Sequence, residues 1–158
     1  MRIRWIKGQW GIPDDGVMHF KASVRATAVA MMEDLLRSRD YLGIYITGTS
    51  EWAPPVQRTR LVAVTRPLDM PAGKRPEDFR EPDDDGSIRW NVGWPVEEPV
   101  LLPAGGIELG PLIKSTCGDG VWLNDIRAHL QGGRPFALEG TLAPAAAELD
   151  RLLAGSAR

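Results

Sequence analysis

Two of the chain's six tryptophans stand in segments with the composition of loops. Trp10 lies in KGQWGIPDDG (residues 7–16), and Trp52 lies in GTSEWAPP (residues 48–55). No apolar stripe of a helix or strand explains an indole ring at either position, whereas binding residues often stand on loops. A base stacked on an aromatic side chain gains about 1–3 kcal/mol. Trp10 and Trp52 are therefore candidate walls of a pocket for a flat ring.

Polar residues precede both tryptophans. Lys7 and Gln9 come before Trp10, and Thr49 and Ser50 come before Trp52. Glutamine presents a donor and an acceptor together, as recognition of a base edge requires. We expect these four polar side chains at the rim of the pocket.

The other four tryptophans are predicted to be core residues. In SIRWNVGW (residues 87–94) the apolar residues occupy every second position and form one continuous face of a strand. Burying a large aromatic side chain contributes about 2–3 kcal/mol to folding, which explains its presence without a ligand. The residues assigned to the core in this way are Trp5, Trp90, Trp94 and Trp122.

Residue types that bind metals or carry out catalysis are scarce. Cys117 is the only cysteine and His19 and His129 are the only histidines, which excludes an internal disulfide and a thiolate zinc cluster. The run at residues 83–85, DDD, lacks the spacing of oxygen ligands and is interpreted as a solvated loop. The segment GPLIKSTCGDG lacks the glycine spacing of a phosphate-binding loop. We expect no metal, no cofactor and no catalytic residue.

The charge balance leaves the class of ligand open. A formal net charge of −2 argues against a protein held to nucleic acid by bulk charge alone. Fifteen of the nineteen basic residues are arginine, which suits bidentate contacts with phosphates and base edges. A local basic face and a GC-rich genome explain this richness equally well. No apolar run could span a bilayer and the N-terminal segment has no signal-peptide core, so we expect a cytoplasmic protein without membrane contact.

Periodicity predicts one α+β domain over residues 1–158, because the strands cluster in the middle of the chain. Ser23 is the expected N-cap of the first helix, and Gly155 is the expected C-cap of the last. We expect a small barrel or strongly curved sheet of about five or six strands, flanked by two or three helices. The predicted strands are residues 2–6, 41–47, 58–66 and 87–94, with a further short strand inside QGGRPFALEG. The predicted helices are residues 23–37, 121–130 and 141–155. The predicted long loops are residues 7–16 and 67–86.

The order of these segments resembles the PUA-like superfamily, and within it the EVE and YTH-type domains. The resemblance rests on RWIKGQW, YLGIYITGTSEW, RLVAVTRPL, SIRWNVGW and GGRPFALEGTLAPAAAELDRLL, which together span nearly the whole chain. It implies a β-barrel fold and a reader of modified bases, in which one extruded nucleobase is held in an aromatic pocket.

The resemblance also implies the positions of the site. By their match to the family's first strand and neighbouring loop, the base-binding residues are Lys7, Gly8, Gln9, Trp10, Thr47, Gly48, Thr49, Ser50 and Trp52. Arg134 matches the basic residue that contacts backbone phosphate in YTH domains. The chain departs from the YTH pattern before its Trp-bearing strand, where Phe79 is the only aromatic residue and the second cage tryptophan is missing. Either another residue such as Trp52 closes the cage, or the ligand is not a nucleic acid.

Three hypotheses follow. The first is a non-catalytic module that binds a modified or flipped base in DNA or RNA, with or without a nuclease partner. The second is a domain for a small molecule or a peptide on the same fold, which the net charge of −2 favours. The third is an enzyme acting on nucleosides or RNA, for which Glu51 and Asp40 are the nearest carboxylates in sequence.

Overall fold

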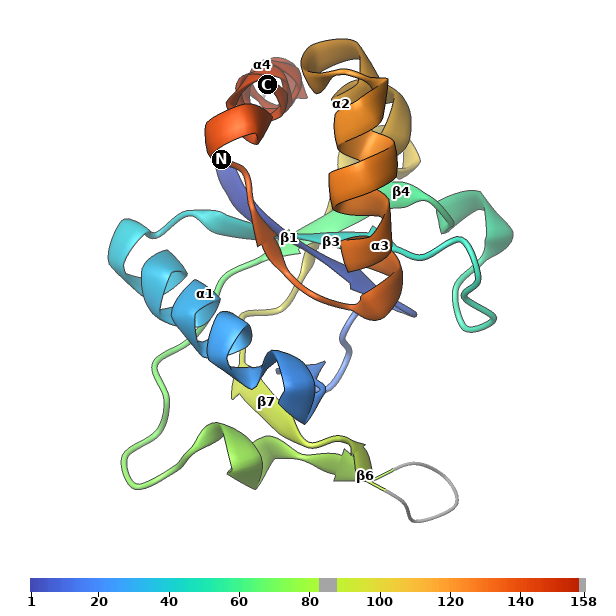
Figure 1. The fold of residues 1–158 in the computed structure, drawn as a ribbon. Coiled ribbons are helices and arrows are strands. Elements are labelled where there is room, and N and C mark those ends of the chain that lie inside the picture. The colour runs from blue at the N-terminus through green and yellow to red at the C-terminus, as the bar shows by residue number, and fades with distance from the viewer. Residues whose placement is uncertain (83–87, 157–158) are drawn as a thin grey trace.

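A mixed sheet of six strands forms the centre of the computed structural model, which describes residues 1–82 and 88–156 (Figure 1). The predicted acidic loop at residues 83–85 lies outside the described residues, and so does Ser87, the predicted start of a strand. The strands follow the order β10–β1–β3–β4–β8, and β9 also pairs with β4. Their bounds are β1 (Ile3–Gln9), β3 (Tyr41–Ile46), β4 (Arg60–Thr65), β8 (Val100–Leu101), β9 (Ile107–Glu108) and β10 (Phe136–Ala137).

The α+β class and a sheet of six strands agree with the sequence prediction, but the sheet is open in the described residues. β10 pairs only with β1, and β8 pairs only with β4, so no ladder joins the two edges. Each edge strand has two residues, which is too short to continue the sheet around a barrel axis. β1 and β3 are parallel, and the other pairs are antiparallel.

The prediction of one strand over residues 87–94 is wrong. The chain forms β6 (Ile88–Trp90), breaks at Asn91, and continues as β7 (Val92–Pro95). β6 pairs with β5 (Glu81–Pro82), whereas β7 pairs with β2 (Val17–Phe20), a strand that the sequence pattern did not reveal. Trp90 and Trp94 therefore belong to different sheets and share no continuous face. Trp94 is buried, and its Nε1 donates to the Leu68 carbonyl at 2.8 Å.

The described residues form four α-helices, whereas the sequence predicted two or three. The first predicted helix is confirmed as α1 (Arg25–Ser38), and the last as α4 (Ala143–Ser156). Ser23 is not an N-cap, because it lies inside a 3-10 turn that precedes α1, and Gly155 lies inside α4 instead of capping it. None of these helices has the length and apolar character needed to cross a membrane.

Residues 109–132 are more helical than predicted. The segment rejected as a phosphate loop forms α2 (Leu109–Cys117), whose Leu109, Leu112 and Ile113 are buried. The predicted helix at 121–130 begins as a π-helical segment, η5 (Val121–Ile126), and continues as α3 (Arg127–Gly132). The 3-10 segments are η1 (Ala22–Val24), η2 (Pro55–Gln57), η3 (Pro76–Phe79), η4 (Pro103–Gly105) and η6 (Gly140–Leu142).

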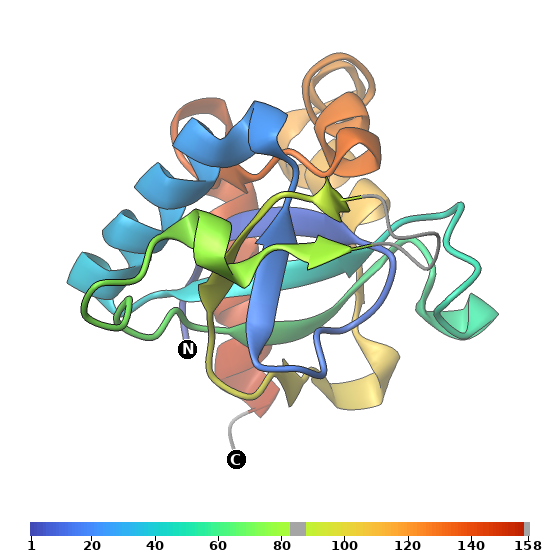
Figure 2. The same cartoon turned by 90° about the horizontal axis from the view of Figure 1, so that it is seen from below.

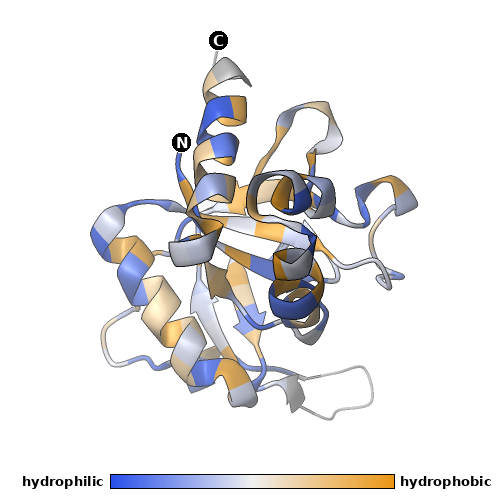
Figure 3. Cartoon of the chain, turned by 45° about the horizontal axis from the view of Figure 1, so that its top comes forward, coloured by the Kyte–Doolittle hydropathy of each residue, from blue (hydrophilic) through white to orange (hydrophobic). Residues whose placement is uncertain are grey.

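Two hydrophobic cores lie on opposite faces of the sheet. One lies between the sheet and the helices α2, α3 and α4, and the other lies between the sheet, α1 and the β2–β7 pair (Figures 1 and 2). Along α1, Ala28, Met31, Met32 and Leu35 are buried at helical spacing, and Figure 3 shows apolar and polar residues alternating along this helix. Each helix therefore packs one face on the sheet.

The first strand extends further than the sequence suggested. Residues 7–9 were assigned to a loop, but Lys7, Gly8 and Gln9 pair in parallel with Ile44, Tyr45 and Ile46 of β3. Gly8 faces α3 so closely that a Cβ built on it would lie 2.2 Å from the Leu130 carbonyl oxygen. The missing side chain at Gly8 is therefore what lets α3 approach the end of β1.

A Gly8→Ala substitution tests this close approach. We expect it to lower the free energy of unfolding by roughly 1–3 kcal/mol, because α3 or β1 must shift to accommodate the methyl group. Gly11→Ala is the control, since a Cβ there meets nothing within 4 Å, and it should change stability by less than about 0.5 kcal/mol. Equal effects of the two substitutions in urea unfolding would contradict the packing described here.

Candidate functional site

The most unusual side chain in the described structure is Lys7, which is 1% exposed. Its Nζ donates to the Gly8 carbonyl at 3.2 Å and lies 5.1 Å from the centre of the Phe20 ring and 5.8 Å from that of Trp90. A Cβ built on Gly133 would lie 3.8 Å from the same nitrogen. Lys7 was expected at the rim of a pocket, and this expectation is wrong because the continuation of β1 carries it into the protein interior.

Burial changes the protonation of this amine. The pKa of Lys7 is lowered from 10.5 to about 7, first by burial and second by the positive charge of Lys21. No ion pair with a carboxylate is described for Lys7 to offset this effect. The amine is therefore close to half protonated at neutral pH.

Trp10 contacts Trp90 and not Trp52. The Trp10 and Trp90 rings meet edge to face, with their centres 5.7 Å apart and their planes at 82°. Lys21 Nζ lies 6.0 Å from the Trp90 ring, so two lysines flank that indole. We predicted Trp90 to be a core residue, but it is only partly buried. Its ring contacts Trp10 and also lies near the Lys7 amine. The described ring contacts are pairs and form no larger aromatic cluster.

Sequence reasoning missed Trp90 because it treated residues 87–94 as one strand with one apolar face. The signal that could have separated Trp90 from Trp94 is Asn91, a residue disfavoured within strands. Phe20 and Gly133 were also missed, since their approach to Lys7 depends on the placement of β2 and of the turn after α3.

Ser50 fixes the loop that follows β3 against the end of β1. Its buried hydroxyl donates to the Trp10 carbonyl and accepts from the backbone N–H groups of Trp52 and Ala53, each at 3.3 Å. The backbone N–H of Thr47 donates to the Gln9 carbonyl at 3.0 Å. The predicted base-binding segments 7–10 and 47–50 are therefore neighbours, and the Ser50 hydroxyl is occupied within the protein.

The remaining predicted residues differ in their environment. Trp52 is 74% exposed, and its ring makes no contact with a described ring. Its backbone lies near that of Trp10, because the Ser50 hydroxyl bonds to both. Gly48 and Thr49 are exposed, whereas the Thr47 hydroxyl is buried and has no partner among the described residues. The Gln9 amide donates to the Met18 sulfur. These contacts make Gln9 a packing residue in this conformation.

Arg134 is exposed immediately after Gly133, which has a φ of 69° and ends α3. Its backbone N–H donates to the His129 carbonyl at 3.0 Å, and its guanidinium makes no hydrogen bond or ion pair with a described residue. Arg134 is therefore an exposed residue next in sequence to Gly133, which approaches Lys7.

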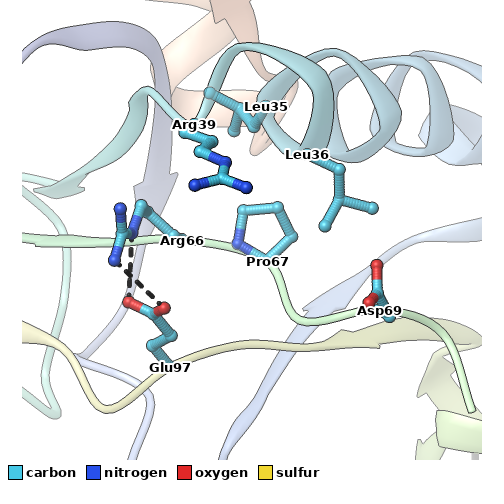
Figure 4. Close-up of a pocket in the computed structure, with 7 residues that line it drawn as sticks. All are labelled: Leu35, Leu36, Arg39, Arg66, Pro67, Asp69 and Glu97. Carbon is cyan, nitrogen blue, oxygen red and sulfur yellow. Dashed lines mark hydrogen bonds and ion pairs between the residues drawn. The ribbon is translucent and has the colours of Figure 1, made fainter.

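A hollow of about 320 Å³ lies away from these residues, at the start of β3 and the end of α1 (Figure 4). Arg66 lines this hollow. Its guanidinium donates two hydrogen bonds to the Glu97 carboxylate, at 3.2 and 3.3 Å, and its Cζ lies 4.9 Å from the centre of the Tyr41 ring. Tyr41 begins β3, whereas Ile46, which pairs with Gln9, ends it. The hollow and the Lys7 region therefore lie toward opposite ends of that strand.

One described group could hold a metal ion. His19 Nε2 lies 2.9 Å from Asp15 Oδ2 and 3.2 Å from Glu81 Oε2, and the three ligand atoms lie within 4.8 Å of one another. Asp15 and Glu81 are exposed, and His19 Nδ1 is buried without a partner. These contacts join β2 to the β5–β6 hairpin, which carries Trp90.

Comparisons with protein-family models, with curated proteins and with solved structures found no match for this chain.

The Lys7 amine makes a testable contribution to the pH dependence of stability. Its pKa is lower in the folded than in the unfolded chain, so between about pH 7 and 10.5 the unfolded state binds more protons and stability rises with pH. A Lys7→Met substitution removes this cost. We expect the variant to gain on the order of several kcal/mol at pH 6, and a smaller amount at pH 9.

Urea unfolding of both proteins at the two pH values measures the difference. Lys21→Met is the control, because Lys21 is only partly buried and no pKa shift is resolved for it. A Lys7→Met effect that is the same at pH 6 and pH 9 would show that the amine has an ordinary pKa.

Proposed function

We propose that this protein is a non-catalytic module that binds a flipped, modified nucleobase in DNA or RNA, on a PUA-like fold of the EVE or YTH type. The observation that carries the proposal is the contact of Trp10 with Trp90, whose ring lies 5.8 Å from the buried Lys7 amine. The α+β fold and the neighbouring positions of segments 7–10 and 47–50 support the same proposal.

The physical requirement for such a module is a gain that exceeds the cost of base extrusion. Extrusion costs a few kcal/mol, and stacking on an aromatic ring returns about 1–3 kcal/mol. Stacking alone is therefore marginal, and a polar group is needed that recognises the base edge. Trp10, which is 38% exposed, offers the stacking surface, and Lys7 offers the polar group.

Local rather than overall charge attracts the nucleic acid backbone in this proposal. The formal net charge of −2 is unfavourable for contacts with phosphates. Arg134 stands beside the site on the surface, and Lys21 stands beside Trp90. These two cations supply a short basic path past the proposed base site.

A small flat molecule or a peptide is the second candidate ligand, and the net charge favours it. An enzyme is less well supported. Asp40 lies 3.9 Å from Arg2 before β3, at the end of that strand away from Gln9. Glu51 is exposed in the following loop, and no described carboxylate is bonded to Lys7. The described residues offer no acid–base pair around the amine.

Two matched tryptophan substitutions test the base-binding site. Trp10→Ala should weaken binding of a modified-base oligonucleotide roughly tenfold to hundredfold through lost stacking. Trp52→Ala should leave the Kd within about twofold, because the exposed Trp52 ring makes no contact with the ring of Trp10 or Trp90. Fluorescence anisotropy measures both, with the melting temperature recorded for each variant. Loss of binding in Trp52→Ala alone would move the site to the loop after β3.

Salt dependence tests the class of ligand. A contact between Arg134 and a phosphate should give a Kd that rises with salt, and Arg134→Ala should reduce the slope of log Kd against log salt by about one. Arg151→Ala is the control, because Arg151 is exposed on α4 and pairs with Glu148. A flat salt titration of the unsubstituted protein would favour the small-molecule alternative.

A further inference from the structure

The Lys7 amine has unused hydrogen-bonding capacity. An ammonium group has three N–H donors, and a neutral amine has two donors and one lone pair. The Gly8 carbonyl is the one acceptor described for it, at 3.2 Å. At least one N–H group of a side chain that is 99% buried therefore has no described acceptor.

The surroundings of the amine supply no second partner. β1 contributes the Gly8 carbonyl, β2 contributes the Phe20 ring, and β6 contributes the Trp90 ring. The turn after α3 contributes the backbone of Gly133, and among the described residues the charge that acts on Lys7 is that of Lys21, which repels an ammonium. These neighbours are ring faces, backbone and a like charge.

Fold stability does not explain a lysine at this position. A buried donor without an acceptor is unfavourable, and an apolar side chain of similar length would pack against Phe20 and Trp90 without that cost. A group that is costly in the free protein is expected where a ligand supplies the missing partner.

We propose that Lys7 Nζ donates a hydrogen bond to a ring carbonyl oxygen of the bound base, so that the site selects oxo bases over the corresponding amino bases. This inference rests on the proposed base-binding function and names its ligand class. An oxo group accepts the N–H of Lys7, whereas an exocyclic amino group at the same ring position presents hydrogens to it.

The selection depends on the charge of the amine. As an ammonium, Lys7 has donors only and rejects an amino group, and as a neutral amine it has one lone pair that accepts from such a group. Because Lys21 is the only charged group described beside Lys7, the discrimination should be stronger at pH 6 than at pH 8.5.

The test uses the full chain and two pairs of single-stranded oligonucleotides. Each pair differs at one base, hypoxanthine against adenine in the first and uracil against cytosine in the second. The unsubstituted protein should bind the oxo member of each pair about tenfold to hundredfold more tightly at pH 6, the value of one charge-assisted hydrogen bond. Lys7→Met should abolish the preference, and Trp10→Ala should weaken both members of a pair by the same factor.

The outcomes separate this inference from the proposed function. Binding that depends on Trp10 but has the same oxo-to-amino ratio in Lys7→Met overturns the inference and leaves the base-binding function intact. Absence of binding to all four probes overturns the inference, because it leaves no oxo base selected. Binding that is indifferent to Trp10→Ala overturns both the inference and the proposed base-binding site. Melting curves check that the Lys7→Met variant is folded. We expect it to be folded, because the substitution removes a buried amine that lowers stability.

Discussion

The parallel pairing of β1 with β3 is the constraint on which the rest of the structure depends. It continues from Ile3 to Gln9 and so draws Lys7 into the sheet, beside Ile44. Parallel pairing leaves the ends of both strands at one edge of the sheet, and the Thr47 N–H closes that end by donating to the Gln9 carbonyl. The two segments that hold the candidate residues are neighbours for this reason.

The buried Lys7 side chain lowers the stability of the fold, and we explain its presence by a binding role. Burial and the positive charge of Lys21 lower the pKa of the Lys7 amine, and one of its N–H groups has no described acceptor. The protein accommodates this because the two cores on either face of the sheet supply the apolar burial that stabilises the fold. A local cost of several kcal/mol is tolerable there, and such costs are characteristic of functional sites.

The β5–β6 hairpin connects the candidate site to the rest of the molecule. It carries Trp90 against Trp10 and Lys7, and Glu81 at its start lies 3.2 Å from His19 of β2. η3 packs on β7 just before this hairpin, where the absence of a side chain on Gly93 admits the Phe79 backbone. The aromatic ring nearest Lys21 and Trp10 is therefore positioned by contacts that lie far apart in sequence.

The sequence by itself determined the α+β class, the strands at the centre of the sheet and the helices α1 and α4, because these elements have long, regular apolar periods that local propensity reinforces. The resemblance to EVE and YTH-type domains also implied that residues 7–10 and 47–50 lie together, and the Thr47 N–H bond to the Gln9 carbonyl joins them. Only the tertiary structure decided that Lys7 is buried, that Trp90 and not Trp52 meets Trp10, and that the sheet is open in its described part. Those features depend on which strand pairs with which, and pairing between distant segments is set by burial on both faces of the sheet, which a local pattern does not contain.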